Sequence, residues 1–470
     1  MKALYMLSFI NLAVYKLIYS GHCLSDNIHI GYNFTLPIPV EYIQGFNGKA
    51  YLMETDQMPL NFRTALSVDA VDGIYCCSLQ VFLGNVKVWT SGHHSMFCTT
   101  SQSCVLEFTE IGDLRLKAFN GQIGWRTATF GQGVQKLQLF DSGNLALVDA
   151  QENIKWQSFN FPTNVLLMGQ RLSVATHLTS SIPTNNSNSF FSFEIHHDKL
   201  ALYLNLGSND IKYSYWEFHP SATRNITYIH LSSKGLDLFD DKYRNFSQIL
   251  SPIEQPVRFL ALANDTGNLG LYYYSPYKDK FEASFQVLNA TCDLPLACSP
   301  YEICTYSNTC SCIRLLTNPG DHTSKFDCDP GITGKLCGKK QVEMIELQDS
   351  GTLLRNSTTM TNVSKDECAN SCLNDCDCAA ALYSSRIGEC MFYDTVRGVK
   401  QVNRGSGLSY LVKVPKGSTG NQKKSGLRKW VLVLIIAADG LILCVVIGGL
   451  GYFLIWKRRK MSNDCNSDAS

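Results

Sequence analysis

The most constraining feature of this chain is an apolar run near its C-terminus. The 27 residues from Trp430 to Trp456 carry one charged side chain, Asp439, and a cluster of four basic residues follows at 457–460. A helix rises about 1.5 Å per residue, so this run would be roughly 40 Å long, enough to cross a hydrocarbon core of about 30 Å. Residues 430–456 are therefore predicted to form a transmembrane helix.

The N-terminus has the pattern of a secretory signal peptide. Met1-Lys2 precedes an apolar run at 4–14, and Gly21-His22-Cys23 offers a small-residue cleavage site. Lys16 interrupts the end of this run and gives some weight to the alternative, an ordinary buried segment. With the later span, we expect a single-pass type I protein whose N-terminal region is extracellular. The 14 residues at 457–470 are fewer than the ~40 that a domain needs to fold unaided, so we expect no catalytic domain there.

Sequons and cysteines agree with an exported chain. Of 19 cysteines, Cys444 and Cys465 lie in or after the span, and cleavage after Cys23 leaves 16 (19 − 3), an even number. Clustered cysteines in an exported chain indicate disulfides, and the absence of a CxxC pair argues against zinc. The N-x-S/T acceptors, all before the span, are Asn33, Asn185, Asn225, Asn245, Asn264, Asn289, Asn356 and Asn362.

The region from about 24 to 291 has the pattern of β-structure. Short apolar or alternating runs recur between Gly, Asn, Asp and Pro residues, as in an all-β prism or barrel. Three of these runs follow a Gly-Asp-Leu or Gly-Asn-Leu turn, at 112–114, 143–145 and 267–269. Gly and Asn tolerate the positive φ of a tight reversal, so the recurrence predicts a repeated turn-and-strand unit.

One segment carries a specific resemblance to a known family. Residues 156–170, WQSFNFPTNVLLMGQ, are similar to the WQSFDxPTDTLLPGQ signature of plant G-type, or S-locus-like, lectin receptors. Trp89 and Trp125 are consistent with the family's Trp-bearing strands. The resemblance implies an all-β extracellular region with a bulb-type lectin β-prism of three four-stranded sheets and a second, related β region in tandem. It also implies a small disulfide-rich EGF-like module and an α+β PAN/apple module.

The implied domain order covers the whole chain. It is a signal peptide (1–23), a bulb-type lectin domain (24–170), a second β-rich lectin-like region (171–291), an EGF-like module (292–337), a PAN/apple module (338–414), a stalk (415–429), the transmembrane helix (430–456) and a cytoplasmic tail (457–470).

The resemblance also implies disulfide pairs in the two small modules. In the second module, Cys368, Cys372 and Cys376 are spaced by four, as on one helical face, and Ser364 with Glu367 forms a capping-box pattern. By analogy the pairs are Cys292–Cys304, Cys298–Cys310, Cys312–Cys328, Cys368–Cys390 and Cys372–Cys378. The pairing of Cys76, Cys77, Cys98, Cys104, Cys337 and Cys376 stays open, with Cys337 considered as the partner of Cys376.

Bulb-type lectins hold mannose with Q-x-D-x-N-x-V-x-Y, whose polar side chains bind sugar hydroxyls. Aligned on the three turns, the first repeat keeps none of these residues, the middle keeps Asn144, and the last keeps Asn268 and Tyr272. A site without its donors and acceptors cannot hold a sugar specifically. We expect Asn144 and Asn268 to be turn residues, and Asn268 with Tyr272 is the one pair to test for carbohydrate binding.

The sequence predicts a binding protein rather than an enzyme. It has no Walker A motif and no kinase His-Arg-Asp motif, whereas members of the resembled family usually carry a kinase. Asp439 lies within the span beside Gly440 and Gly448, which predicts a lateral contact with a membrane partner such as a receptor kinase. The alternative is a protonated or water-reaching Asp439. The net charge of +1 indicates no nucleic-acid partner.

We therefore expect a kinase-less, receptor-like glycoprotein of the plant plasma membrane. It would recognise an extracellular glycan or protein ligand and act through its membrane partner, in a homo- or hetero-oligomer. The alternative is an autonomous cell-surface lectin. No cofactor and no metal are expected.

Overall fold

The computed structural model describes residues 25–38, 46–56, 60–93, 95–101, 103–181, 189–206, 211–221, 224–313, 328, 342–355 and 357–415. The predicted signal peptide, transmembrane helix and tail lie outside the described residues, as do Asp439, Gly440 and Gly448. Over the part that is described, the chain has no helix of the length and apolar character that a membrane crossing needs.

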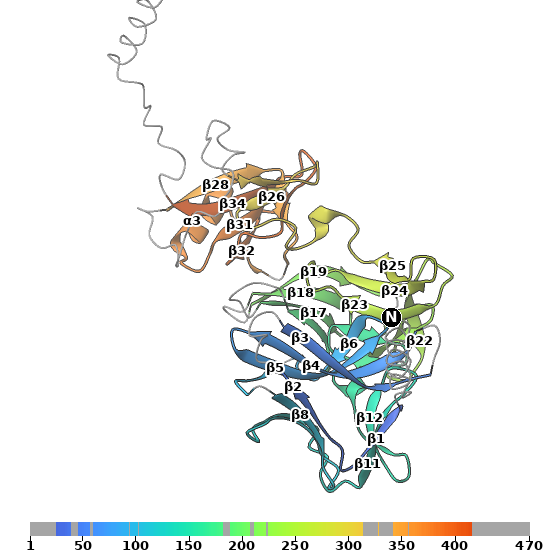
Figure 1. Ribbon diagram of the computed structural model, residues 1–470. Helices are drawn as coiled ribbons and strands as arrows, with labels where there is room; N and C mark the ends of the chain where they lie inside the picture. Colours follow the sequence, from blue (N-terminus) through green and yellow to red (C-terminus); the bar gives the residue numbers. More distant parts are fainter. Residues whose placement is uncertain are drawn as a thin grey trace, which may run out of the picture.

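The first part of the chain forms a β-prism of three antiparallel sheets (blue to teal in Figure 1). Each sheet has four consecutively paired strands, and the first sheet carries an extra short strand, β7. The sheets are β3 (Phe46–Glu54), β4 (Phe62–Val71), β5 (Ile74–Leu83) and β6 (Val86–Thr90) with β7 (Phe97–Thr99); β10 (Ile123–Arg126), β9 (Leu114–Ala118), β8 (Ser103–Phe108) and β2 (Asn33–Pro37); and β1 (Asn27–His29), β11 (Val134–Leu139), β12 (Leu145–Asp149) and β13 (Ile154–Gln157). Their inward side chains, including Leu66, Leu106 and Leu147, share one core.

The second part repeats this architecture with three further four-stranded sheets. They are β14 (Val165–Leu167), β23 (Val257–Leu262), β24 (Leu269–Ser275) and β25 (Lys280–Gln286); β15 (Arg171–Ser173), β20 (Tyr228–Ser232), β21 (Gly235–Phe239) and β22 (Asn245–Leu250); and β16 (Leu178–Ser181), β17 (Phe190–Ile195), β18 (Leu200–Asn205) and β19 (Lys212–Phe218). The second β-rich region is thus a second prism.

The boundary between the prisms lies earlier than the sequence suggested. Strand β14 pairs with β23, a strand of the second prism, so the first prism ends with β13 at residue 157 rather than at residue 170. Side chains alternate between the two faces of a strand. Val165 and Leu167 enter the first core and Leu166 enters the second. All three residues of β14 are apolar, so the sequence did not indicate which prism this strand joins.

The whole sheet β14–β23–β24–β25 follows this alternation and lies between the two prisms. Leu260 and Leu271 are buried in the second core. Phe259 belongs to the first core, and Tyr272 packs against that core from the same sheet. One sheet therefore contributes to both cores, and the two prisms share a continuous apolar contact.

The cysteine-rich segment predicted to be EGF-like (292–337, called the EGF-like segment below) and the PAN segment are also joined by a sheet. Strand β26 (Glu302–Cys304) pairs with β27 (Cys310–Cys312) and, in parallel, with β33 (Val399–Gln401), which pairs in turn with β29 (Ser350–Thr352). The two modules predicted to meet at 337/338 therefore share backbone hydrogen bonds. The core of the second prism continues through Ile303 into this part of the chain.

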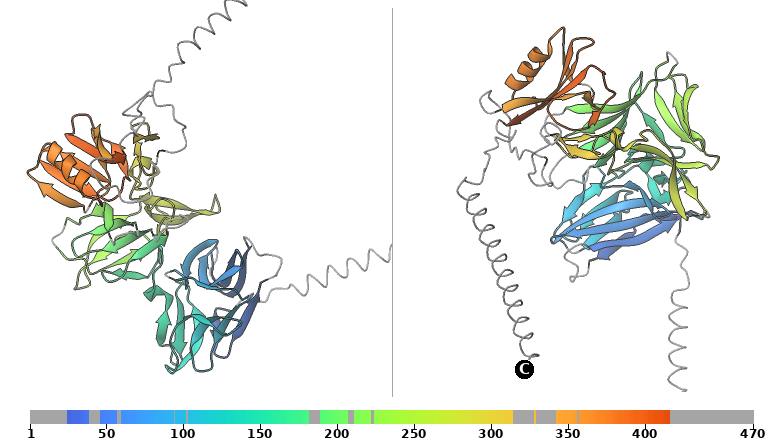
Figure 2. Two further views of the ribbon diagram at one scale, coloured as in Figure 1. Left: turned by 90° about the vertical axis from the view of Figure 1, so that its left-hand side faces the viewer. Right: turned by 90° about the horizontal axis from the view of Figure 1, so that it is seen from above.

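The PAN module is a five-stranded sheet with one helix against it. The strand order is β28 (Val342–Gln348), β34 (Leu408–Pro415), β31 (Ala380–Ser384), β32 (Glu389–Tyr393) and β30 (Thr358–Thr361). Helix α3 (Lys365–Asn374) begins after Ser364, whose side chain accepts from the Glu367 N–H in the predicted capping box. Figure 2 shows this module, in orange, beside the green second prism and away from the blue first prism.

The disulfides implied for the two small modules are the ones that the structure forms. All five pairs are present, and Cys376 is also disulfide-bonded, to a partner outside the described residues, where Cys337 lies. The four cysteines left open in the first prism pair as Cys76–Cys98 and Cys77–Cys104. Neighbours on a strand point to opposite faces, so β5 ties one cysteine to β7 and the next to β8, in another sheet.

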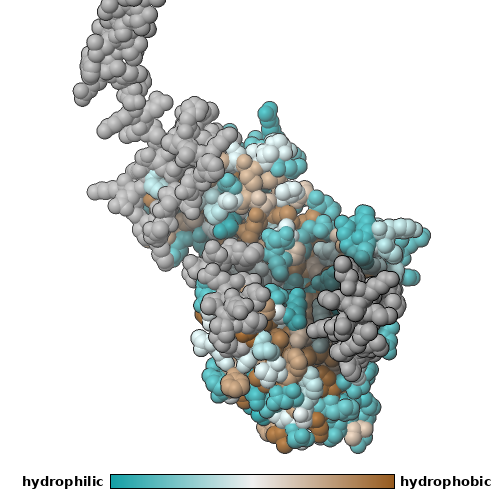
Figure 3. Space-filling view, in the orientation of Figure 1, coloured by the Kyte–Doolittle hydropathy of each residue, from teal (hydrophilic) through white to brown (hydrophobic). Residues whose placement is uncertain are grey.

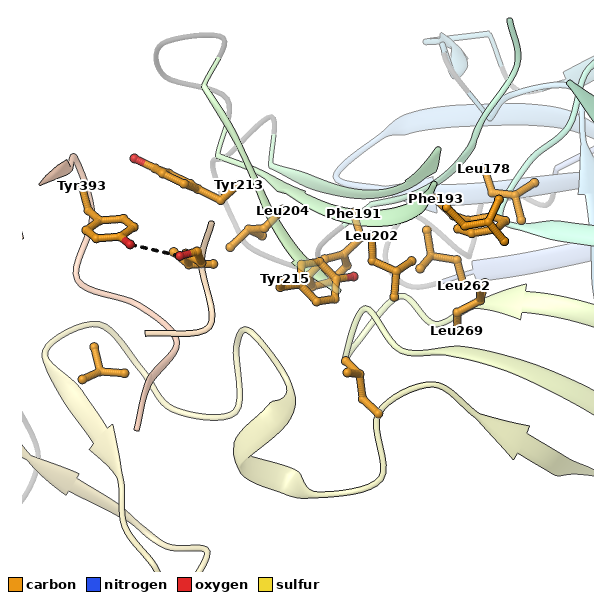
Figure 4. Close-up of a cluster of buried hydrophobic side chains, with 14 of the residues drawn as sticks. Leu178, Phe191, Phe193, Leu202, Leu204, Tyr213, Tyr215, Leu262, Leu269 and Tyr393 are labelled. Carbon is orange, nitrogen blue, oxygen red and sulfur yellow. Dashed lines mark hydrogen bonds between the residues drawn. The ribbon is translucent and has the colours of Figure 1, made fainter. Parts of the chain in front are cut away.

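The PAN module docks on the second prism through tyrosines. Tyr213 on β19 donates its hydroxyl hydrogen to Asp394 Oδ1 at 2.7 Å and accepts from the Asp394 N–H at 3.2 Å. Its ring lies 5.8 Å from that of Tyr393, whose hydroxyl donates to the Leu354 carbonyl (Figure 4). Burial is the main reason that the pKa of Tyr213 lies well above its ordinary value, so the hydroxyl keeps its proton.

Candidate functional site

The three glycine turns predicted as a repeat share one hydrogen-bonding arrangement. Asp113, Asn144 and Asn268 follow glycines with φ of 82°, 83° and 70°. In each case the side-chain Oδ1 accepts from a backbone N–H that lies 15 to 20 residues further along the chain. The donors are Thr129 N at 3.1 Å, Phe159 N at 3.3 Å and Leu288 N at 3.1 Å. In each repeat the turn is therefore hydrogen-bonded to the backbone that follows the next strands of the same sheet.

The two candidate sugar-binding asparagines have their amide groups occupied by the protein. Asn144 donates its Nδ2 to Gln157 Oε1 at 2.7 Å, and Asn268 donates to the Leu288 carbonyl at 2.7 Å. They are 7% and 6% exposed. Each amide therefore uses its oxygen and one of its two Nδ2 hydrogens within the protein and is nearly buried, so the geometry gives both residues a structural role.

Tyr272 lies where a sugar cannot stack on it. Its ring is stacked on Phe259 at 5.0 Å and 14°, and both rings pack against the first core across the shared sheet. Burial raises the pKa of its hydroxyl. Asn268 and Tyr272 therefore do not form a mannose-type pair in this structure.

The signature segment helps to build a tryptophan cluster at one end of the first prism. Trp89, Trp125 and Trp156 come from β6, β10 and β13, one from each sheet, with ring centroids 5.8–6.4 Å apart in edge contacts. Trp89 Nε1 donates to the Phe161 carbonyl at 2.9 Å. The hollow that they line holds about 270 Å³. We assign the cluster to packing, because the three rings contact one another and the Trp89 N–H is already bound within the protein.

A larger hollow lies where the segment leaving the first prism meets the second. This groove, of about 560 Å³, is lined by Phe159, Asn160, Pro162, Arg171, Ser173, Thr176, Thr227, Tyr228, Asp240, Asp241 and Tyr243. They come from the signature segment, from β15 and the residues after it, from the start of β20 and from the β21–β22 turn. We call it the inter-prism groove, and its size falls within the usual range for ligand sites.

The β21–β22 turn is organised around a buried carboxylate. Asp240 is 2% exposed, and its Oδ1 accepts from the N–H groups of Lys242 and Arg244 at 3.0 and 2.9 Å. The backbone N–H of Arg244 is the main reason that the pKa of Asp240 lies below its ordinary value, and the Arg244 guanidinium adds to the effect. The arrangement holds Tyr243 with φ of +59° and its side chain 71% exposed.

Sequence reasoning missed the inter-prism groove. Its lining comes from separate stretches of the chain, none of which has the spacing of a known motif. The one local signal was a bulky aromatic residue, Tyr243, in a Gly/Asp/Asn-type turn position, which becomes informative only when its φ is known. On the face shown in Figure 3, hydrophobic and hydrophilic residues are interspersed over the described part of the prisms.

The predicted glycosylation acceptors are accessible where the structure describes them. Asn33, Asn225, Asn245, Asn264, Asn289 and Asn362 are all exposed, and Asn185 and Asn356 lie outside the described residues. Asn225 is two residues before Thr227, which lines the groove.

Comparisons with known proteins agree with this architecture. Residues 87–188 match the D-mannose binding lectin family, and residues 343–413 match the PAN domain family. Three relatives from Arabidopsis thaliana match most of the chain. A G-type lectin S-receptor-like serine/threonine-protein kinase is 24% identical over 90% of this chain, a PAN domain-containing protein is 28% identical over 73%, and EP1-like glycoprotein 4 is 24% identical over 72%.

This chain is a relative of the plant G-type lectin receptor proteins. It matches the lectin and PAN domain families that are described above. The match covers 52% of the length of the receptor kinase, 70% of the PAN domain protein and 80% of the EP1-like glycoprotein. Among solved structures, a monomeric monocot mannose-binding lectin from Gastrodia elata is 20% identical over 28% of this chain and 96% of the lectin, with a TM-score of 0.19.

Proposed function

We propose that this chain is an extracellular, receptor-like protein that binds a carbohydrate or protein ligand through its two-prism head. The observation that carries this proposal is the combination of lectin and PAN family matches in a head that is closed by disulfides. Seven disulfides join described cysteines, which is typical of proteins that fold in an oxidising, exported compartment. Relatives named as receptor kinases and as EP1-like glycoproteins support the same class of function.

The finer part of the proposal concerns how recognition is transmitted. The apolar run at 430–456 would anchor the chain in the plasma membrane, with the head outside. A signal would then pass to a membrane partner such as a receptor kinase. Asp439, Gly440 and Gly448 would form the contact within the bilayer, because a carboxyl there needs a polar partner and small residues allow close approach.

The alternative is a cell-surface lectin that acts by itself. The inter-prism groove favours it, because aromatic and polar side chains meet there at a size suited to a ligand. The mannose-type turn positions do not favour it, since Asn144 and Asn268 are held by the protein.

Binding and surface exposure of the full-length protein test the main proposal. The protein, expressed in plant cells, should be removed from intact cells by added protease, and the purified protein should bind at least one probe from an oligosaccharide array or a panel of secreted plant proteins. A protein that protease cannot reach, or one that ignores both panels, would contradict the proposal.

A separate measurement tests the membrane contact. Co-purification with a membrane kinase should be lost when Asp439→Leu is introduced, and retained when Leu434→Ile is introduced at another position in the same span. A kinase complex that survives Asp439→Leu unchanged would remove the proposed contact while leaving extracellular recognition standing.

A further inference from the structure

We propose that the inter-prism groove binds a neutral oligosaccharide, an inference that rests on the proposed recognition function and names its ligand class. It is distinct from the turn positions where the resemblance placed mannose. The argument depends on which polar groups in the groove are free, on the charge that they carry, and on the conformation of one aromatic residue.

The free polar ends in the groove suit a ligand rich in hydroxyl groups. Among the described residues, neither the Arg171 guanidinium nor the Asp241 carboxylate has a hydrogen-bond or ion-pair partner, and the Nδ2 of Asn160 donates to no protein acceptor. Asn160 uses only its Oδ1, which accepts from Gln157. Hydroxyl groups both donate and accept, so sugar hydroxyls can satisfy a guanidinium, a carboxylate and an amide together.

The charges in the groove favour a neutral ligand. Arg171 and Asp241 contribute one positive and one negative free charge. The buried Asp240 carboxylate is already matched by Arg244, at 2.9 Å, with Arg224 a further 3.7 Å contact. The free charges thus balance, so a charged ligand would meet one group of its own sign as well as one of the opposite sign and would gain no net attraction over a neutral ligand.

Tyr243 supplies an aromatic face at the rim. A bulky residue with positive φ is uncommon, and strained backbone of this kind clusters at binding sites. The first prism contains the same turn around Asp149, whose Oδ1 accepts from the N–H groups of Gln151 and Asn153, both at 2.9 Å. There the left-handed position is held by Glu152, with φ of +63°. The turn therefore does not require an aromatic residue. The Tyr243 ring contacts the Tyr228 ring at 6.0 Å and 53° while most of its surface stays exposed, so it extends the aromatic surface of the groove.

The groove also has a fixed floor. Arg171 lies over the Tyr228 ring at 5.1 Å, and Tyr228 is stacked on Phe239 at 4.8 Å and 3°. The stem of Arg171 is thereby held on an ordered aromatic pair, so that little of its side-chain freedom remains to be lost when a ligand binds. An ordered cation beside an exposed ring is a preorganised arrangement for a sugar ring with its hydroxyls.

The test uses the full-length protein, purified from plant cells, and two sets of probes of equal length. The neutral set comprises cello-, xylo- and manno-oligosaccharides, and the acidic set comprises oligogalacturonides. We expect saturable binding of a neutral probe and weaker binding of the acidic set. Tyr243→Asn and Arg171→Gln should each weaken neutral binding about tenfold, as expected for the loss of a stacking face or a charged hydrogen bond.

Matched variants separate binding from folding. Asn tolerates the left-handed conformation, so Tyr243→Asn should fold as the wild type does. Glu152→Asn makes the same change at the equivalent turn of the first prism and should leave binding unchanged. Asn225→Gln removes a sequon beside the groove and should also leave binding unchanged.

Each other outcome overturns the proposal. Neutral binding that the Tyr243 and Arg171 variants leave intact would place the sugar elsewhere and keep the general recognition function. Capture of a defined secreted protein without any neutral sugar would reject the groove ligand and again keep that function. Binding that appears only in Asn225→Gln would mean that the chain's own glycan covers the groove.

Discussion

At the scale of single residues, the structure gives Asn268, a candidate for sugar binding, a role in stabilising a turn. Asn268 bridges the Leu288 N–H and carbonyl, both buried, through its amide oxygen and nitrogen. We expect Asn268→Ala to lower the free energy of unfolding by about 1–3 kcal/mol, because two buried backbone groups lose their partners. Denaturant unfolding of the full-length protein measures this change.

The matched control for Asn268→Ala is Asn120→Ala. Asn120 also accepts from a backbone N–H, that of Gln122, but in an exposed turn where water can replace it. Its loss should stay within about 0.5 kcal/mol. Equal effects of the two substitutions would show that the buried bridge does not stabilise the turn.

Much of the residue-level chemistry could be read from the sequence, and the reason is local spacing. Gly-Asn-Leu predicted a turn at 267–269 because Gly and Asn tolerate positive φ, and Gly267 has that φ. The destination of the Asn268 side chain could not be read, because Leu288 is 20 residues away and its position depends on the paired strands. Tyr243 was missed for a different reason, because its positive φ cannot be read from its residue type.

At the scale of elements, β14 is buried on both faces, and each face lies in the core of a different prism. Leu166 is 0% exposed in the second core, and Leu167 is 3% exposed in the first. We expect Leu166→Ala and Leu167→Ala each to lower the free energy of unfolding by about 2–5 kcal/mol, the usual cost of a buried leucine. Urea denaturation followed by tryptophan fluorescence measures it, with the 37%-exposed neighbour Met168→Ala as control.

A strong effect of one leucine alone would contradict the two-sided burial of β14. The sequence could not predict this arrangement, although it predicted strands in the region. A strand with one solvated face alternates apolar and polar residues, and the alternation reveals its register. Val165, Leu166 and Leu167 are all apolar, so nothing in them says that each face meets a different core.

At the scale of the whole molecule, a cluster of ion pairs and hydrogen bonds around Glu217 links the second prism to the PAN module. Glu217 accepts from Lys199 Nζ at 2.8 Å and Ser214 Oγ at 2.9 Å, with Arg355 Nη1 at 3.7 Å. Burial raises the pKa of Glu217, but the hydrogen bonds from Lys199 and Ser214 outweigh it, so the pKa lies below its ordinary 4.5. A carboxyl of this kind stabilises the fold above its ordinary pKa, and the contribution is lost as pH falls through the folded-state value.

We therefore expect the free energy of unfolding to decrease as pH is lowered below about 4.5. Glu217→Gln should be less stable than the wild type at neutral pH and should show a shallower decrease in acid, since it has no proton to take up. Thermal unfolding of both proteins between neutral pH and about pH 3 measures the difference. Parallel curves would exclude Glu217 as a contributor.

The lectin and PAN domains were the easiest parts of this molecule to predict, because the WQSF signature and the cysteine spacings are local. The way in which neighbouring domains merge was not predictable. Strand β26 of the EGF-like segment joins β33 of the PAN module across almost 100 residues, and only the folded chain brings Ile303 beside Val399.

The sheet shared by the two prisms limits how the protein could change its conformation when a ligand binds. Separating the prisms would expose to water the face of β14–β23–β24–β25 that packs on the first core, including Val165, Leu167 and Phe259, so the hydrophobic effect opposes a hinge motion between the two prisms. Ligand at the groove would instead leave the shape nearly unchanged. Under the proposed recognition function, a signal would then depend on gathering several molecules on a multivalent glycan, or on presenting the bound ligand to a neighbouring receptor as part of a composite surface.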